Sequence, residues 1–321
     1  MSFSRDLRII YMGTPDFAVE PLKALLDDGY NVVAVITAPD KPAGRGLKLH
    51  ESAVKNFAIE KGLNIFQPEK LRDQSFLNQI EALKPDLGIV IAFRMLPEIL
   101  WSMPKYGTFN LHASLLPQYR GAAPINWAVI NGEEYTGVTT FMLNSEIDKG
   151  DIILQKRVGI DYGDNAGTLH DKLMNVGAKV VPETVDVIFS GKYDPVMQDN
   201  DSSELKPAPK IFKADCRINW NGSAENIRNH IRGLSPYPGA WTEMSTGEEN
   251  VQFKIFAVDS EIVRNTDRNP GEILSDGKKE LKVACGNGYV YIKELQPSGK
   301  KRMLVEEFLR GFKNINECSF N

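Results

Sequence analysis

Hydrophobic residues between the N-terminus and about residue 190 recur in short runs that alternate with amphipathic segments of helical length. The runs are "LRIIYMG", "NVVAVIT", "PDLGIVIAF", "TFNLHASLL" and "GVTTFML". Between them, "FAVEPLKALLDDG", "SAVKNFAIEKG" and "QSFLNQIEALKP" space their apolar residues by three and four, as helices with one buried face do. Strands that alternate with helices predict an α/β fold with a mostly parallel sheet covered on both faces.

The pattern changes after residue 192. The stretch 193–210 is polar, contains prolines and has no period, so we predict a linker. Beyond it, the β-rich runs "NVQFKIFAV", "ELKVACG" and "GYVYIKELQP" are separated by turn residues, with helices near "AENIRNHIRGL" and "LVEEFLRGF". This is typical of a small barrel or sandwich. A chain of 321 residues favours two domains, which we place at 1–192 and 211–321.

Composition narrows the class of protein without naming a function. The three cysteines Cys216, Cys285 and Cys318 include no C-x-x-C pair, which argues against a disulfide framework and a cysteine zinc site. No apolar run has the length of a signal peptide or a membrane span, so we expect a soluble cytoplasmic protein. The net charge is −4, with about +2 from Pro209 onward and −6 before it. This asymmetry is a mild indication that the C-terminal part meets an anion.

The stretch "FNLHASLLPQYRGAAP" carries the strongest candidate chemistry. Asn110 and His112 lie two residues apart in a predicted strand, so their side chains share one face, next to the strand end where α/β sheets bind ligands. Asp148 follows another strand in "NSEIDKGDII". Taken singly, such a histidine is commonly structural and such an aspartate a turn residue. Together they suit addition of an amine to a carbonyl, with an amide donor for the developing negative charge, and none is a strong nucleophile.

Two further segments bear on the type of ligand. "TAPDKPAGRGLKLHES" is a long loop with the cations Lys41, Arg45 and Lys48. A loop of this kind is either simply solvated or shaped to bind something, and its small residues would let it lie along a phosphate backbone. "MGTPDF" has only Gly13 where a dinucleotide site needs G-x-G-x-x-G, which argues against a nicotinamide oxidoreductase.

Six stretches together resemble the methionyl-tRNA formyltransferases, within the wider family that transfers formyl groups from 10-formyltetrahydrofolate. They are "MGTPDFA", "DKPAGRG", "NLHASLLPQYRGAAPINWAVINGE", "DKGDII", "GTLHDKL" and "LQPSGKKRM". The resemblance implies a Rossmann-like catalytic domain, the linker, and a small open β-barrel related to the oligonucleotide-binding fold that binds tRNA. It also implies formylation of the α-amine of initiator methionyl-tRNA for translation initiation, with no metal, no membrane partner and a monomeric chain.

The resemblance assigns roles residue by residue. Asn110, His112 and Asp148 are the implied catalytic residues. The implied folate contacts are Ser114, Leu115, Leu116, Pro117, Phe93 and Leu96, and the implied tRNA contacts are Lys41, Arg45 and Lys48. Further cations could hold the helical body of the tRNA, namely Lys206, Lys210, Lys213, Arg217 and Lys300 to Arg302. The chain departs from the family at Arg94 and Ala113, where glycine is frequent, and at Gln118 and Tyr119, where Arg-Trp is frequent.

The implied mechanism has Asn110 and a protonated His112 donating to the formyl oxygen while Asp148 holds the imidazolium and helps to remove the amine proton. Sugar-nucleotide and glycinamide ribonucleotide formyltransferases would share these three residues, so the catalytic set cannot separate the substrates. The tRNA interpretation depends on the Arg45 loop and the C-terminal domain. A tRNA-binding protein without activity would not need the three residues together.

Overall fold

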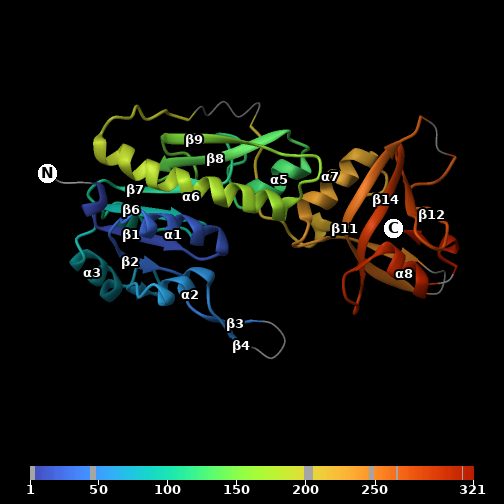
Figure 1. Cartoon of the computed structure of the whole chain (residues 1–321), viewed down its shortest axis with the longest axis horizontal. Coiled ribbons are helices and arrows are strands. Elements are labelled where there is room, and N and C mark those ends of the chain that lie inside the picture. Colours follow the sequence, from blue (N-terminus) through green and yellow to red (C-terminus); the bar gives the residue numbers. More distant parts are fainter. Residues whose placement is uncertain (1–3, 44–47, 199–204, 246–248, 265–266, 313) are drawn as a thin grey trace. The chain divides into compact units, whose positions relative to one another are not determined.

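The structure, a computed structural model, describes residues 4–43, 48–198, 205–245, 249–264, 267–312 and 314–321. The chain forms two compact units (Figure 1). The first comprises Met1–Gly121, Thr136–Gly159 and His170–Pro207, and the second comprises Ala122–Tyr135, Ile160–Leu169 and Ala208–Asn321. Two segments that precede the predicted linker thus group with the C-terminal residues, and the boundaries at 192 and 210 stay a prediction.

A seven-stranded sheet in the order β5-β2-β1-β6-β7-β8-β9 forms the centre of the first unit. Its strands are β1 (Ile9–Gly13), β2 (Val32–Ile36), β5 (Ile65–Phe66), β6 (Leu87–Ile91), β7 (Thr108–His112), β8 (Tyr135–Met142) and β9 (Ile152–Gly159). The pairs from β5 to β7 are parallel, whereas β7 and β8 are antiparallel. This confirms the Rossmann-like, mostly parallel sheet.

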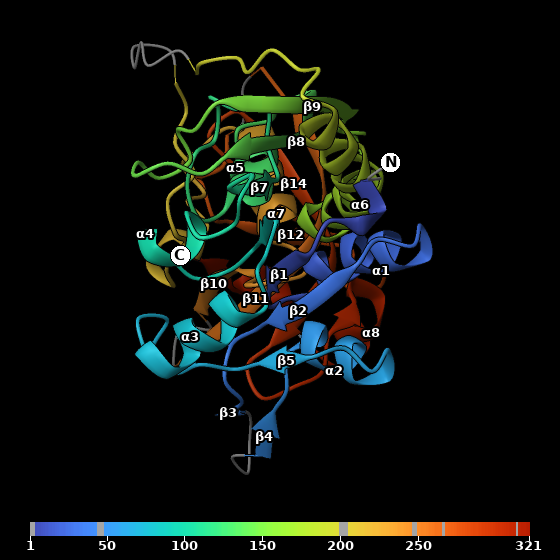
Figure 2. The same ribbon diagram turned by 90° about the vertical axis from the view of Figure 1, so that its left-hand side faces the viewer.

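Helices cover both faces of this sheet (Figure 2). On one side lie α1 (Val19–Asp27), α2 (Ala53–Glu60) and the long α6 (Ala166–Ser190), and on the other lie α3 (Gln74–Ala82) and α4 (Glu98–Trp101). Side chains of α3 and α4 share a buried cluster with Ile10, Met12 and Val90 of the strands. Short 3₁₀ turns, η1 (Ser4–Asp6) and η2 (Asp16–Ala18), lie before β1 and before α1.

Two segments predicted to be irregular contain regular pairing. The loop 37–52 holds an antiparallel hairpin of β3 (Lys41–Ala43) and β4 (Lys48–His50), which projects from the first unit in Figures 1 and 2. In the predicted linker, Val196 forms an antiparallel bridge with Ile152 of β9. The backbone of Tyr119 also donates to Lys206 O. The described residues 193–198 and 205–207 of this stretch therefore belong to the first unit and are held by contacts within it.

The second unit contains an antiparallel barrel in the order β12-β13-β14-β11-β10-β16, with β15 beside β14. The strands are β10 (Ala240–Ser245), β11 (Asn250–Ile262), β12 (Ile273–Ser275), β13 (Leu281–Cys285), β14 (Gly288–Pro297), β15 (Met303–Leu304) and β16 (Ser319–Phe320). An isolated bridge between Glu272 and Ser319 joins the two ends of this order. Gly271 at this seam has φ +92°, and a Cβ there would lie 2.1 Å from Phe320 O, so the closure requires glycine. The predicted open barrel is confirmed.

Helices complete the second unit. They are α5 (Pro124–Ile130), α7 (Ala224–Leu234) and α8 (Val305–Gly311), with 3₁₀ turns η4 (Ala214–Cys216) and η5 (Ile315–Glu317). Ile227 and Ile231 of α7 enter one buried cluster with Met244 and Phe253 of the barrel. Helix α5 packs on α7, where the Asn126 side chain donates to Gly233 O at 2.8 Å.

Candidate active site

Strand β7 presents Asn110 and His112 to one face of the sheet and Leu111 to the other. A Cβ on Gly177 of α6 would lie 2.7 Å from Leu111 Cδ2, so Leu111 is buried against α6. Because side chains alternate along a strand, Asn110 and His112 point to the opposite face, which α3 and α4 cover elsewhere. The structure therefore confirms that these two side chains share a face.

The Asn110 side chain is a polar group in an apolar part of the sheet. Its neighbours across the strands are Val90 of β6 and Phe141 of β8, both buried. Within the described residues, the half-buried Asn110 amide makes no hydrogen bond. Its polar atoms are not among the fully buried unpaired atoms of the described residues, so the amide is accessible and available to a ligand.

His112 is held by one ring nitrogen. The side chain is 7% exposed, and its Nε2 lies 2.9 Å from the carbonyl oxygen of Tyr119. A carbonyl only accepts hydrogen bonds, so Nε2 carries the proton and donates. Within the described residues Nδ1 has no hydrogen-bond partner. Nδ1 is therefore the nitrogen that can take part in chemistry.

Asp148 does not contact His112. Its Oδ2 accepts a hydrogen bond from Gly121 N at 3.0 Å, and no hydrogen bond or ion pair joins its carboxylate to the imidazole among the residues described. The expected direct pairing is thus absent, because the two side chains bind different residues of the segment 119–121. Asp148 has φ +54°, a left-handed conformation that is costly for a residue with a Cβ and is often found at functional sites.

Gln198 and Arg120 complete the surroundings of Asp148, and neither was predicted. Gln198 Nε2 donates to Asp148 O at 3.0 Å and to Gly150 O at 2.7 Å. Its Oε1 accepts from Arg120 Nε at 3.0 Å and from Nη2 at 2.6 Å. Gln198 lies in a stretch without periodicity, so the sequence carries no signal for its contacts.

The predicted folate contacts divide by burial. Ser114 is fully buried and its Oγ donates to Gln118 O at 2.6 Å, and Leu116 is buried in a cluster with Phe141 and Ile152. Leu115 and Pro117 are half-buried. Phe93 and Leu96 are also half-buried, and both pack against the cluster that contains Val90, the neighbour of Asn110. Phe93 and Leu96 therefore lie on the same face as the Asn110 amide.

Arg94 and Gln118, two of the residues that depart from the family pattern, make contacts that hold the loops at the ends of β6 and β7. The Arg94 guanidinium donates to Glu69 O at 2.8 Å and to Pro68 O, and it lies 5.7 Å from the centre of the Phe93 ring. Gln118 Oε1 accepts from Lys206 N at 2.9 Å. Tyr119 is buried and has φ +59°. Arg94 and Gln118 thus tie the loops after β6 and β7 to neighbouring segments.

The hairpin predicted to contact tRNA is fixed at its base. Thr37 Oγ1 and Ser52 Oγ are 2.7 Å apart, and Lys55 Nζ bonds the carboxylates of Asp40 and, at 2.8 Å, Glu51. The hydrogen bond from Lys55 lowers the pKa of Asp40, and the same bond raises the pKa of Lys55. Lys41 is exposed on β3. Arg45 lies outside the described residues, as does the side chain of Lys48.

The predicted tRNA cations of the second unit differ in their surroundings. Lys213 and Arg217 lie 5.7 and 5.3 Å from the centre of the Trp241 ring, which makes a basic and aromatic patch. Arg217 also forms an ion pair with Glu243 at 3.7 Å, whereas Lys213 makes no ion pair among the described residues. Lys301 instead pairs with Glu307 at 3.0 Å, and Arg302 makes two bonds to the Glu294 carboxylate. The Lys300 to Arg302 cluster is therefore largely neutralised.

Three general features bear on the chemistry. No group of His, Cys, Asp or Glu in the described part of the chain could hold a metal ion. All three cysteines are buried free thiols, and burial raises the pKa of each. Among the described residues, no helix is long and apolar enough to span a membrane.

A model of the formyl transferase family matches residues 7–185, more than half of the chain. The chain belongs to the formyl transferase family. Residues 210–313 match the C-terminal domain of the formyl transferases. The match of both models agrees with the resemblance that the sequence motifs carry.

Relatives within the formyl transferase family match over almost the whole chain. The methionyl-tRNA formyltransferase of Bacteroides thetaiotaomicron is 56% identical, over 96% of both chains. That of Flavobacterium johnsoniae is 50% identical, over 97% of this chain and 98% of its own. Among solved structures, the N-formyltransferase of Helicobacter canadensis covers 92% of this chain and all of its own, with 19% identity and a TM-score of 0.64. HypX of Aquifex aeolicus covers 94% of this chain and 47% of its own, with 17% identity and a TM-score of 0.63.

Proposed function

We propose that the chain transfers the formyl group of 10-formyltetrahydrofolate to the α-amino group of initiator methionyl-tRNA. The observation that carries this proposal is the 56% identity to a methionyl-tRNA formyltransferase over 96% of both chains. A match over 96% of both chains takes in the first unit as well as the C-terminal barrel. A shared substrate is the simplest reason for both parts to be retained.

In the proposed reaction the neutral α-amine attacks the formyl carbon, and the formyl oxygen gains negative charge. Asn110 donates to this oxygen from its unpartnered amide. His112 donates from Nδ1, which requires a protonated ring because Nε2–H is already bound to Tyr119 O. Donors placed in advance where charge develops lower the barrier. Asp148 accepts the amine proton, directly or through water, with the carboxylate oxygen that Gly121 does not bind. Collapse of the tetrahedral intermediate then breaks the bond between the formyl carbon and N10 of the folate, and N10 takes up a proton and leaves as tetrahydrofolate.

The two substrates are assigned to different surfaces. Phe93, Leu96, Leu115 and Pro117 offer half-buried apolar surface, which suits a flat heterocycle. Ser114 and Leu116 keep the β7 loop folded instead of touching the ligand. Lys41, Arg45 and Lys48 on the β3–β4 hairpin, together with the Lys213, Arg217 and Trp241 patch, are assigned to tRNA phosphates and bases. We also infer a cytoplasmic monomer, in which the buried thiols stay reduced.

The proposal is tested by formylation assays with four amine substrates. The purified chain and 10-formyltetrahydrofolate are incubated with initiator methionyl-tRNA, free methionine, a dTDP-linked amino sugar or glycinamide ribonucleotide. We expect rapid formylation of methionyl-tRNA alone, because binding energy from the whole tRNA positions the amine. Formylation of the amino sugar or the ribonucleotide without methionyl-tRNA would overturn the proposed substrate.

A further inference from the structure

A buried glutamine joins the loop of Asp148 to the loop that follows β7, the strand of Asn110 and His112. Gln198 is 4% exposed, and it follows the bridge between Val196 and Ile152. Its amide group uses both N–H bonds and its oxygen. A fully satisfied buried amide of this kind fixes the groups around it.

The donor side of Gln198 fixes the Asp148 loop. Its Nε2 bonds the carbonyls of Asp148 and Gly150, two residues apart. Between them the chain is tight, because a Cβ on Gly150 would lie 1.6 Å from Met142 O. Asp148 itself has the left-handed φ of +54°, which persists only where neighbouring contacts hold it. Gln198 supplies two of these contacts.

The acceptor side of Gln198 fixes the loop after β7. Its Oε1 receives Arg120 Nε and Nη2 at 3.0 and 2.6 Å. Arg120 stands between Tyr119, whose carbonyl holds His112, and Gly121, whose N–H holds Asp148. The segment 119–121 therefore connects the His112 imidazole, the Asp148 carboxylate and the Gln198 amide.

We propose that Gln198 and Arg120 are positioning residues for formyl transfer, which set the Asp148 carboxylate relative to the His112 imidazole. This inference rests on the proposed function. Within the described residues Asp148 and His112 make no hydrogen bond to each other, and the 119–121 segment together with Gln198 links the two groups. Because a displacement of about 1 Å in a catalytic group can cost about 100-fold in rate, a brace of this kind controls kcat.

The main test is Gln198→Met, which keeps the volume and removes both donors and the acceptor. We expect kcat for methionyl-tRNA to fall about 100-fold, with the KM for both substrates unchanged and the limbs of the pH–rate profile displaced. In an Asp148→Asn background the same change should cost little more, because the brace acts through Asp148. Gln198→Glu keeps the acceptor for Arg120 but cannot donate when ionised, so it should behave like Gln198→Met.

Thr184→Val is the matched control. The Thr184 hydroxyl is buried and bonds Thr140 Oγ1 at 3.0 Å and Val180 O at 2.7 Å, so its loss lowers stability without touching the Asp148 loop. We expect a lower melting temperature with the wild-type kcat and pH profile. If Gln198→Met does not fold, Gln198→Glu and Arg120→Lys carry the same comparison.

The outcomes separate the two proposals. A wild-type chain that does not formylate methionyl-tRNA contradicts the proposed function. With an active wild type, a normal kcat and pH profile in the folded Gln198 variants overturns the brace. An equal loss in the wild-type and Asp148→Asn backgrounds also overturns it, because Gln198 would then act independently of Asp148.

Discussion

Asn110 differs from an ordinary residue of a core strand in what its side chain lacks. An asparagine with a structural role makes hydrogen bonds to other residues, as Asn126 does with Gly233 O. The Asn110 amide has no such bond within the described residues and lies between Val90 and Phe141. Because this half-buried amide bonds no other described residue, it adds little to stability and is free to donate to developing negative charge.

Replacement of Asn110 by alanine should therefore separate activity from stability. We expect kcat to fall by a factor on the order of 10² to 10³, since one oxyanion donor contributes roughly 2.7–4 kcal/mol in other enzymes. The melting temperature should stay equal or rise, because no hydrogen bond is lost. Asn126→Ala is the control: it removes a made bond and should lower stability by about 0.5–1.5 kcal/mol at unchanged kcat. A destabilised but fully active Asn110→Ala chain would exclude the donor role.

The two nitrogens of His112 have different roles, so replacement by glutamine and replacement by asparagine should have opposite effects. In His112→Gln the amide nitrogen replaces Nε2 and keeps the bond to Tyr119 O, whereas in His112→Asn it replaces Nδ1. We expect the Gln variant to fold normally and to be nearly inactive. The Asn variant should keep some activity, because its amide can still donate from the position of Nδ1. Steady-state rates across pH check this, and a more active Gln variant would place the chemistry at Nε2.

At the level of elements, periodicity predicted the strands and helices whose faces differ in polarity. The segments that became β1, β2, β6, β7 and β8 were all recognised, as were α1, α2 and α3. Helix α6 was not, because Gly177, Pro182 and several valines inside it favour other structures. The β3–β4 hairpin was missed because its strands have three residues each, and the Gln198 contacts were missed because they are long-range. Local patterns carry no information on such contacts.

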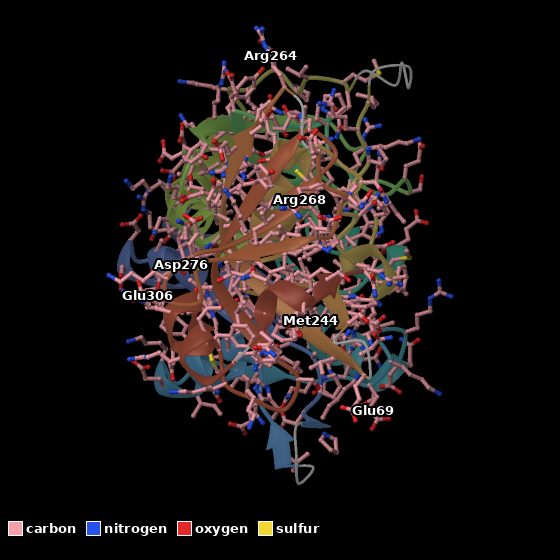
Figure 3. All side chains as sticks on the ribbon, turned by 90° about the vertical axis from the view of Figure 1, so that its right-hand side faces the viewer. Glu69, Met244, Arg264, Arg268, Asp276 and Glu306 are labelled. Carbon is pink, nitrogen blue, oxygen red and sulfur yellow. The ribbon has the colours of Figure 1, made fainter. Side chains whose placement is uncertain are left out.

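The stability contributed by the turn between β12 and β13 should depend on pH. The Asp276 carboxylate (Figure 3) accepts hydrogen bonds from the backbone of Glu280, Lys278 and Lys279, which lower its pKa from 3.8 to about 2. The folded state thus favours the charged form, so this stabilisation is complete above about pH 4 and is lost as the pH falls toward 2. Asp276→Asn should lower the melting temperature at pH 7, and the difference from wild type should disappear near pH 2.

The exposed Asp267 provides a comparison for Asp276. It lies in the same unit and makes no hydrogen bond within the described residues, so Asp267→Asn should leave the melting temperature unchanged at every pH. Thermal unfolding followed by circular dichroism between pH 2 and 7 measures both variants. A difference between wild type and Asp276→Asn that is constant across this range would mean that the charge of Asp276 does not stabilise the turn.

At the level of the whole molecule, two units were predicted from the change of pattern, but their composition was not. Segments 122–135 and 160–169 belong to the second unit by their contacts, although they lie between elements of the first in sequence. Contacts such as that of Asn126 with Gly233 join residues 107 positions apart. The charge counts likewise indicate an anion-binding C-terminal part. The structure shows which of its cations pair with carboxylates, and these paired cations contribute little to a phosphate site.

This pairing leads to a prediction for tRNA binding. Each phosphate neutralised by a cation contributes roughly 0.9 to the slope of log affinity against log salt for duplex DNA, and we assume a similar order for tRNA. Arg45→Ala, Lys41→Ala and Lys213→Ala should each reduce this slope by about one unit and leave folate affinity unchanged. Arg302→Ala should not, because the Glu294 carboxylate already neutralises its guanidinium. Binding of methionyl-tRNA measured from low to moderate salt distinguishes these variants. An unchanged slope for Arg45→Ala and Lys41→Ala, with wild-type turnover, would remove the hairpin from the tRNA site, whereas a reduced slope for Arg302→Ala would show that tRNA displaces Glu294.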